Sequence, residues 1–516
     1  MAGIGFELKK VFKGNSISKK LWGYSCASIV VGGPTILVII VLVALESIAG
    51  SSADASWDIL LALITYAMIG ALLVASILTQ ILARWSADHL FTKEYDRVLP
   101  ANYGAFLMLV VPFGILAAGL LCTADAVALH DKILTWLTWA LMTMIYIHMG
   151  SITAIKKYVS LVIWFSLGAA AVILSALLFI RVLHMSNVTA ILLAMFIGYG
   201  IIFVGYTYSL HTEFPPGHGS IFRFAEYLDK YKSLLICGFF GIAASFVHII
   251  IMWFFGDYGE QVTGLFYHAR VYDVSSFYAF LVAIPTNVLF VVSMETRFYE
   301  KFRAYFSAVS SNGTLDDVRT ARRNMVHALK SELVRLELIQ LIVLIAYMAV
   351  MRFYLETIGF TQTILILFFL LCIGYAAQGL GASLVLLMLY FDDRKGAAIT
   401  AVSGFCVSAL LTLILAPYPN LYGLSYAVAG LTMFLVGLIR LNYFIIDIDN
   451  NVFTRQPIFE FERSNAFLRY VYRLDEKALE KEKAFIKRRG RLGFDRLKLR
   501  EIEIGEFREK EKGEKT

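Results

Sequence analysis

The stretch that decides the fold is residues 396–439, which read GAAITAVSGFCVSALLTLILAPYPNLYGLSYAVAGLTMFLVGLI. These 44 residues include no charged side chain, whereas a helix needs only about 20 apolar residues to cross a bilayer. Proline ends a helix and disfavours helix in the residue before it, so Pro417 and Pro419 divide the stretch. The sequence therefore predicts two membrane-spanning helices joined by a short turn.

The whole chain has the composition of a membrane protein. Of its 516 residues, 59% are hydrophobic and only 16% are charged, and the mean hydropathy is +0.70. Soluble proteins are about 45–50% apolar and about 25% charged, and disordered chains are more polar still. A soluble or disordered protein is excluded, because an aqueous surface could not hold so many apolar side chains.

Ten further runs carry almost no charge and are long enough to span a bilayer. Because backbone groups in lipid must bond within their own segment, such continuous runs are helices. We predict an all-α membrane protein with twelve transmembrane helices. The ten runs are residues 23–45, 59–83, 100–122, 133–155, 158–180, 187–210, 233–256, 274–294, 338–354 and 357–391.

The basic residues predict how the chain lies in the membrane. Alternate connecting segments hold 23 Lys and Arg on one side before the tail and only 4 on the other. Cytoplasmic loops carry the excess of Lys and Arg, so both termini are predicted to be cytoplasmic. The predicted units are an amphipathic cytoplasmic N-terminus (1–20), a first six-helix bundle (21–210), a cytoplasmic connector (211–232), a second six-helix bundle (233–446) and a charged cytoplasmic tail (447–516).

Catalytic motifs are absent from the sequence. It has no G-x-x-x-x-G-K-[ST] phosphate loop and no arrangement typical of a catalytic triad or a zinc protease. The acidic and basic residues 392–395 read as a solvated turn. Twelve helices without a sizeable soluble domain favour a transporter that is not an enzyme and uses no cofactor, metal or nucleic acid.

Aromatic and amide side chains inside the spans are candidates for a substrate path. Sugar faces stack on aromatic rings, and sugar hydroxyls bond amides and phenols, so a neutral glycan path would carry such groups. For each residue the alternative is helix packing. For His148 and the similar His248 the alternatives are a hydrogen bond between helices or a role in a proton relay. Gly33 and Pro34 are added because they should kink the first helix. The other candidates are Tyr24, Trp139, Tyr146, His148, Tyr199, Asn287, Tyr375 and Gln378.

The first twelve residues, MAGIGFELKKVF, are distinctive. They resemble the N-terminus of the PelG family, the inner-membrane transporters of bacterial Pel exopolysaccharide systems. The resemblance continues with Tyr24, with Gly32-Gly33-Pro34, with the twelve spans and with the charged segments 84–99 and 295–336, which we expect to be cytoplasmic loops. It extends over about residues 1–450.

The resemblance implies both a fold and a pathway. The fold is that of the multidrug/oligosaccharidyl-lipid/polysaccharide exporter superfamily, in which two six-helix bundles related by pseudo-twofold symmetry form a V around a central cavity. In the pathway, a cytoplasmic glycosyltransferase polymerises an N-acetylgalactosamine-rich chain from UDP-sugar for the biofilm matrix, and other membrane subunits hold it at the transporter in the bacterial inner membrane. Charged residues that would dock this enzyme are Lys9, Lys10, Arg84, Asp88, Arg297 and Arg303.

Three other functions remain open at this point. A flippase for a lipid-linked oligosaccharide needs a buried cation patch and a coupling carboxylate, and neither is clear in the sequence. A cation-coupled exporter of small molecules would alter drug resistance independently of any glycan. A membrane scaffold for the polysaccharide synthase would need no path at all.

Overall fold

The computed structural model describes residues 40–41, 43–48, 55–155, 157–215, 221–310, 313–357, 361–451, 470 and 473. The predicted N-terminal segment, most of the first span and most of the tail lie outside these residues. Among the described residues, eleven helices are long and apolar enough to cross a membrane. They coincide one for one with the predicted spans other than 23–45. The chain is a multi-pass membrane protein, and the part of it that the structure describes is almost wholly helical.

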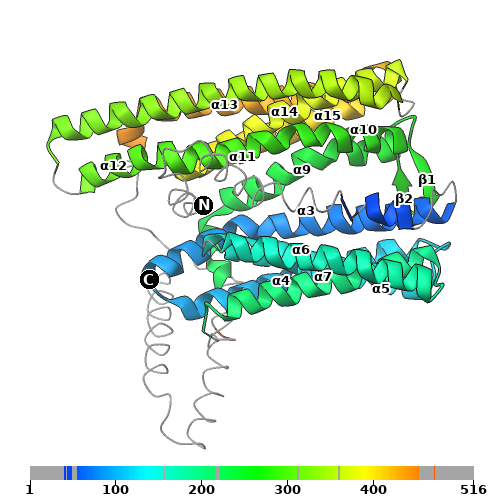
Figure 1. Cartoon of the computed structure of the whole chain (residues 1–516). Coiled ribbons are helices and arrows are strands. Elements are labelled where there is room, and N and C mark those ends of the chain that lie inside the picture. The colour runs from blue at the N-terminus through cyan, green and yellow to red at the C-terminus, as the bar shows by residue number, and fades with distance from the viewer. Residues whose placement is uncertain are drawn as a thin grey trace, which may run out of the picture.

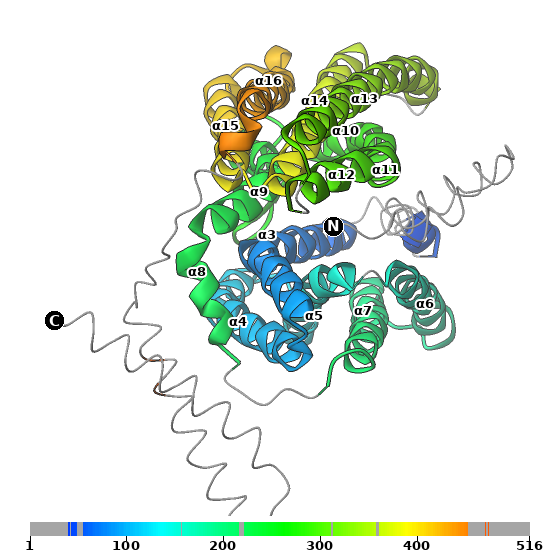
Figure 2. The same cartoon turned by 90° about the vertical axis from the view of Figure 1, so that its left-hand side faces the viewer.

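The described helices lie in two groups that run side by side (Figures 1 and 2). Within each group neighbouring helices pack directly, and α3 and α9 make the main contact between the groups. The first group comprises α3 (Ala55–Thr92), α4 (Val98–Cys122), α5 (Leu129–Ala154), α6 (Tyr158–Leu177) and α7 (Asn187–His211). The second comprises α9 (Lys232–Phe255), α10 (Arg270–Phe280), α11 (Ile284–Ser293), α12 (Tyr299–Ser310), α13 (Leu315–Thr357), α14 (Gln362–Tyr390), α15 (Arg394–Leu415) and α16 (Leu424–Ile446).

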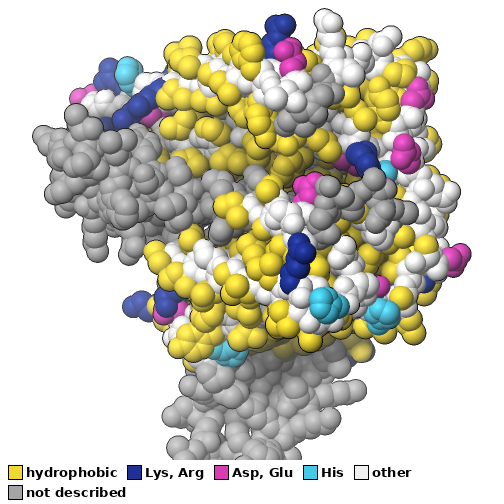
Figure 3. Space-filling model, turned by 45° about the vertical axis from the view of Figure 1, so that its right-hand side comes forward, with side chains coloured by type: hydrophobic (Ala, Val, Ile, Leu, Met, Phe, Trp, Pro, Cys, Tyr) yellow, Lys and Arg dark blue, Asp and Glu magenta, His cyan; other side chains and the backbone are white. Residues whose placement is uncertain are grey.

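The second group packs through small residues. An added Cβ on Gly430 of α16 would lie 2.3 Å from the carbonyl oxygen of Gly374 on α14. Only glycine permits this approach, and small residues at helix interfaces are the usual means of packing helices in a membrane. The face seen in Figure 3 is largely hydrophobic in the residues that the structure describes, with few charged side chains, as expected of a face in contact with lipid.

The predicted break inside residues 396–439 is confirmed, since α15 ends at Leu415 and α16 begins at Leu424. The solvated turn expected at 392–395 is wrong for Asp393. Its buried carboxylate accepts a hydrogen bond from the N–H of Gly396, 3.0 Å away, and caps α15. It also accepts both arms of Arg440 on α16, at 2.8 and 2.9 Å. This carboxylate therefore ties the start of one helix to the next.

The two long charged segments are not loops, contrary to the prediction. Residues 84–99 continue α3 to Thr92 and then form a short 3-10 turn at Tyr95–Arg97. Residues 295–336 form a π-helical turn (Met294–Phe298), then α12, then the first half of α13. They fold as helix because one face is apolar and packs, as Phe302 and Tyr305 of α12 do. A charge count alone does not reveal that face.

A β-hairpin interrupts the helices between α9 and α10. Its strands are β1 (Glu260–Thr263) and β2 (Phe266–His268), paired antiparallel with an irregularity between Gln261 and Thr263. The predicted connector at 211–232 likewise holds a short 3-10 turn (Arg223–Ala225) and α8 (Glu226–Lys230). In Figure 1 the hairpin and α12 lie at opposite ends of the molecule. We call these the hairpin end and the connector end.

Candidate functional site

A cavity of about 630 Å³ lies between the two helix groups. Its walls come from the first part of α3, the last part of α9, β2, α10 and Tyr375 of α14, with further contributions from residues 43–46 and Ile191 of α7. Because α3 begins and α9 ends beside the hairpin, the cavity occupies the hairpin half of the molecule. It is the place where both groups present side chains to a common space.

Aromatic rings form much of the cavity wall. Tyr66 on α3 and Trp253 on α9 stack with centroids 4.7 Å apart and an interplanar angle of 15°. Phe266 of β2, which does not itself line the cavity, packs against Tyr66 with centroids 4.7 Å apart and an interplanar angle of 46°. The wall residues Trp57 and Tyr278 add further aromatic surface. Flat aromatic surfaces with polar edges suit ligands that have one apolar and one hydroxylated face.

Two of the charged groups in the wall, Asp273 and Arg270, have partners within the protein, whereas Glu46 also lines the cavity and is exposed. Asp273 on α10 accepts hydrogen bonds from the indole N–H of Trp253 (2.8 Å) and the backbone N–H of Ala269 (3.0 Å). Arg270 forms an ion pair with Asp58 across the two groups. A carboxylate satisfied in this way positions Trp253 and presents little free charge to a ligand. The cavity wall is mainly apolar and aromatic.

A buried polar network lies behind the wall. Tyr375, which lines the cavity, has its hydroxyl 3.3 Å from Nε2 of His248, whose Nδ1 lies 2.7 Å from the hydroxyl of Tyr272. Gln378 donates to Ser245 Oγ, 2.7 Å away, and accepts from the Tyr426 hydroxyl. The network joins α9, α10, α14 and α16. Two residues that the sequence predicted for the substrate path belong to this network. Tyr375 lines the cavity and Gln378 lies directly behind its wall.

The other predicted path residues lie elsewhere. Trp139 and Tyr146 pack in the core of the first group. His148 is buried, with Nε2 3.3 Å from the Thr207 hydroxyl of α7 and its ring stacked on Phe203. Tyr199 lines a separate small apolar pocket, and Asn287 is exposed on α11. His148 and His248 both hydrogen-bond side chains of neighbouring helices, which is the arrangement that this alternative describes. Tyr24, Gly33 and Pro34 lie outside the described residues.

The hairpin bridges the two groups at its end of the cavity. The N–H of Tyr267 donates to the Tyr66 hydroxyl, 3.0 Å away on α3. The N–H of Leu265 donates to Thr123 Oγ1 at 3.1 Å, in the turn after α4. These bonds fix a segment of the second group onto the first.

A second bridge closes the connector end. Arg84 on α3 pairs with Asp88 (3.1 Å) and, across the groups, with Asp392 before α15 (3.7 Å). Tyr227 of α8 donates to Asp88 at 3.0 Å, and burial together with that carboxylate raises the pKa of Tyr227. The guanidinium of Arg394 lies 4.7 Å from the centre of the Tyr231 ring. We call this cluster the connector clasp.

The remaining charged candidates lie on the α11–α13 side. Arg297 pairs with Glu332 at 3.0 Å, and Arg303 is exposed on α12. Lys9 and Lys10 lie outside the described residues. The structure therefore brings Arg84 and Asp88 together but leaves Arg297 and Arg303 in a separate region.

Comparison with known proteins gives the family. A sequence model of the PelG family, described as "Putative exopolysaccharide Exporter (EPS-E)", matches residues 1–453. The chain belongs to this PelG exporter family. No curated protein matches the chain. The family assignment agrees with the resemblance carried by residues 1–12.

Solved structures of transporters share the fold. A MATE transporter in its straight conformation has a TM-score of 0.56 at 11% identity, covering 81% of this chain and 96% of its own. An outward-facing multidrug resistance MATE family transporter of the MOP superfamily also scores 0.56, at 13% identity, covering 87% and 99%. An inward-facing one scores 0.50 at 12% identity, covering 79% and 95%. The PelG chain thus has a MATE-like transporter fold.

Sequence reasoning missed most of the cavity wall. Tyr66, Trp253 and Tyr278 were available as aromatic residues in or beside predicted spans, but so were dozens of others. What distinguishes them is that α3, α9 and α10 meet there. No spacing within one helix carries that information.

Proposed function

We propose that this chain transports a Pel-type, N-acetylgalactosamine-rich exopolysaccharide across the bacterial inner membrane as a cytoplasmic glycosyltransferase extends it from UDP-sugar. The product would serve the biofilm matrix. The observation that carries the proposal is the aromatic cavity between the two helix groups of an exporter-family chain. A neutral sugar polymer gains from stacking on such walls and needs no buried counter-charge.

In this proposal the connector end faces the cytoplasm and the hairpin end faces the periplasm. The excess of Lys and Arg in the segments of the connector end supports this orientation. The described helices, together with the span at 23–45, would make two six-helix bundles related by a pseudo-twofold axis. Both termini would then be cytoplasmic.

Passage of a growing polymer requires that both ends of the cavity open. The hairpin bonds and the connector clasp are the contacts that would have to open. Tyr375 and Gln378 lie on or behind the path in this scheme, whereas Trp139, Tyr146, His148 and Tyr199 support the first group from within. The exposed charges of α12 and the first half of α13, including Arg303, offer a docking surface for the glycosyltransferase and its membrane subunits.

The direct test uses inverted membrane vesicles supplied with UDP-N-acetylgalactosamine and the cognate glycosyltransferase, with and without this chain. The readout is polymer protected from an added glycan hydrolase. We expect protection only when the chain is present, with a product that organic solvent does not extract.

Two outcomes would overturn the proposal. A protected product that extracts into organic solvent would indicate a lipid-linked oligosaccharide flippase. Unprotected polymer in both samples, with the enzyme bound to membranes only when the chain is present, would indicate a scaffold.

A further inference from the structure

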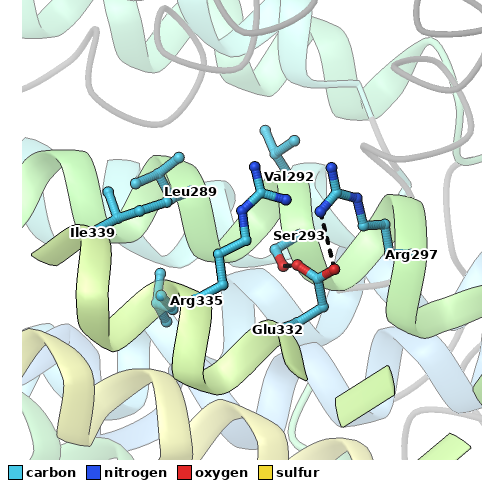
Figure 4. Close-up of a pocket in the computed structure, with 8 residues that line it drawn as sticks. Leu289, Val292, Ser293, Arg297, Glu332, Arg335 and Ile339 are labelled. Atoms are coloured by element: carbon cyan, nitrogen blue, oxygen red, sulfur yellow. Dashed lines mark hydrogen bonds and ion pairs between the residues drawn. The ribbon is translucent and has the colours of Figure 1, made fainter. Parts of the chain in front are cut away.

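A groove separate from the cavity lies between α11 and α13 at the connector end. It is lined by Ser293, Arg297 and apolar side chains of the α11 region, and by Glu332, Arg335 and apolar side chains of α13 (Figure 4). Its enclosed volume is only about 20 Å³, close to what a single water or one oxygen of an anion requires. The groove can seat one polar atom of a ligand that otherwise lies on the surface.

The charges of the groove do not balance. Glu332 is 8% exposed and accepts hydrogen bonds from Ser293 Oγ and from Arg297, whose Nη1 lies 3.0 Å away. Arg335 lies one turn further along α13, and both guanidinium groups lie on the same side of the groove (Figure 4). Among the residues that line the groove, two arginines face one carboxylate. The groove therefore has a net charge of +1 and favours an anion.

The position of the groove along α13 fits the membrane surface. At about 1.5 Å per residue, the 43 residues of α13 extend about 65 Å, roughly twice the hydrocarbon thickness. The first half is rich in charged residues, and the uncharged run begins just after Glu337. Arg335 thus lies where the helix passes from water into lipid.

Apolar surface adjoins the groove on its membrane side. Leu338, Leu341 and Ile342 of α13 are each more than half exposed. Leu289 and Ile339 line the groove itself. An acyl chain could follow this surface while its headgroup remains at the arginines. Basic sites between helices at the cytoplasmic surface are where anionic lipid headgroups bind.

From this geometry we propose that the α11–α13 groove binds the phosphate of an anionic phospholipid headgroup, with Arg297 and Arg335 as the cationic partners. Glu332 pairs with Arg297 and so limits the net positive charge of the groove. The bound lipid would fix the angle at which α12 and α13 leave the membrane. The site is independent of the polysaccharide path, so its failure would not affect the transport proposal.

The test titrates the purified full-length chain with phosphatidylglycerol and measures single-lipid binding by native mass spectrometry. Arg335→Gln should weaken binding about fivefold, since one basic residue near an anionic surface contributes about that factor. Glu332→Gln should strengthen it, because the groove then gains positive charge. If Glu332 served only to stabilise the fold, Glu332→Gln would instead weaken lipid binding.

Two controls complete the test. Arg303→Gln removes an exposed arginine of α12 outside the groove and should leave binding unchanged. Phosphatidylcholine with the same acyl chains should bind less tightly than phosphatidylglycerol. The proposal is wrong if the two lipids bind equally, if Arg335→Gln behaves as the unmodified chain, or if inorganic phosphate alone occupies the groove as tightly as the lipid.

Discussion

Trp253 is the residue on which the aromatic wall depends. Its ring stacks on Tyr66 of the opposite helix group, and its N–H is held by Asp273. We predict that Trp253→Leu, which keeps an apolar side chain but removes the aromatic face, lowers polymer export about two- to tenfold. That range corresponds to the 0.5–1.5 kcal/mol expected of an aromatic contact. Protected polymer in vesicles, normalised to the amount of the chain in the membrane, measures it.

Phe255→Leu is the matched control for Trp253→Leu. Phe255 lies at the end of the same helix but is 64% exposed and does not line the cavity. Export by this variant should equal that of the unmodified chain. Equal losses in both variants would mean that the ring of Trp253 has no specific role.

Gln378 has a role in stability as well as position. Gln378 hydrogen-bonds the buried hydroxyl of Tyr426 and the hydroxyl of Ser245. Gln378→Leu would leave both hydroxyls without this partner and lower the free energy of unfolding by about 1–3 kcal/mol. We predict a lower melting temperature in detergent. Adding Tyr426→Phe should restore part of the loss, because one unpaired hydroxyl is removed. If the double variant melts no higher than Gln378→Leu, the network is not what stabilises this region.

Some residues of the site were predictable and others were not. Tyr375 and Gln378 stand out as polar side chains within a long apolar run. Trp139 stands out in the same way, yet it packs inside the first group. Residue type shows that a side chain needs an unusual environment. It does not show whether that environment is a cavity or a helix interface.

The β-hairpin is the element that connects the groups outside the hydrophobic core. Gly264 at its turn has φ +53°, and an added Cβ would lie 2.0 Å from the carbonyl oxygen of Thr123. We predict that Gly264→Ala pushes the hairpin away from the turn after α4 and breaks the bond from the Leu265 N–H. Hydrogen exchange should become faster at Leu265 and at Tyr267.

Gly119→Ala provides the comparison for the hairpin variant. Nothing lies within 4 Å of a Cβ added at Gly119, near the end of α4. Exchange in residues 260–268 should be unchanged in this variant. Unchanged exchange in Gly264→Ala as well would contradict the bridging role of the hairpin.

The elements themselves were largely predictable, because a span of about 20 apolar residues is determined by the bilayer rather than by tertiary contacts. This argument holds for residues 396–439 and for the other described spans. It fails for residues 295–336, where helix forms through an apolar face hidden among charges. It also fails for the hairpin, whose short strands depend on contacts with Tyr66 and Thr123.

At the scale of the whole molecule, the connector clasp holds the two groups together. Arg84→Gln removes the ion pair with Asp392 and the cationic contact with Tyr231. Exposed or half-buried ion pairs contribute up to about 1 kcal/mol. We therefore predict that the fraction of molecules open at the connector end increases up to about fivefold. Spin labels at Phe91→Cys and Lys395→Cys would report it as longer distances.

The control for the clasp is Arg352→Gln, which removes an ion pair within α13 alone. It should leave the distance distribution unchanged. Identical distance distributions for Arg84→Gln and the unmodified chain would show that the clasp does not control opening at this end.

The way in which the two groups meet was not predictable from the sequence, since the contact of α3 with α9 depends on both surfaces together.

The central claim is that the polymer passes between the two groups through the cavity. Thr65 lines the cavity, and Cys406 is exposed on α15 outside it. Two single-cysteine chains, Thr65→Cys without native cysteines and a chain that keeps only Cys406, would be labelled with a bulky methanethiosulfonate and reconstituted with the glycosyltransferase. We predict that label at position 65 abolishes protected polymer, that reductant restores it, and that label at Cys406 has no effect. Full export with position 65 fully labelled would contradict the account.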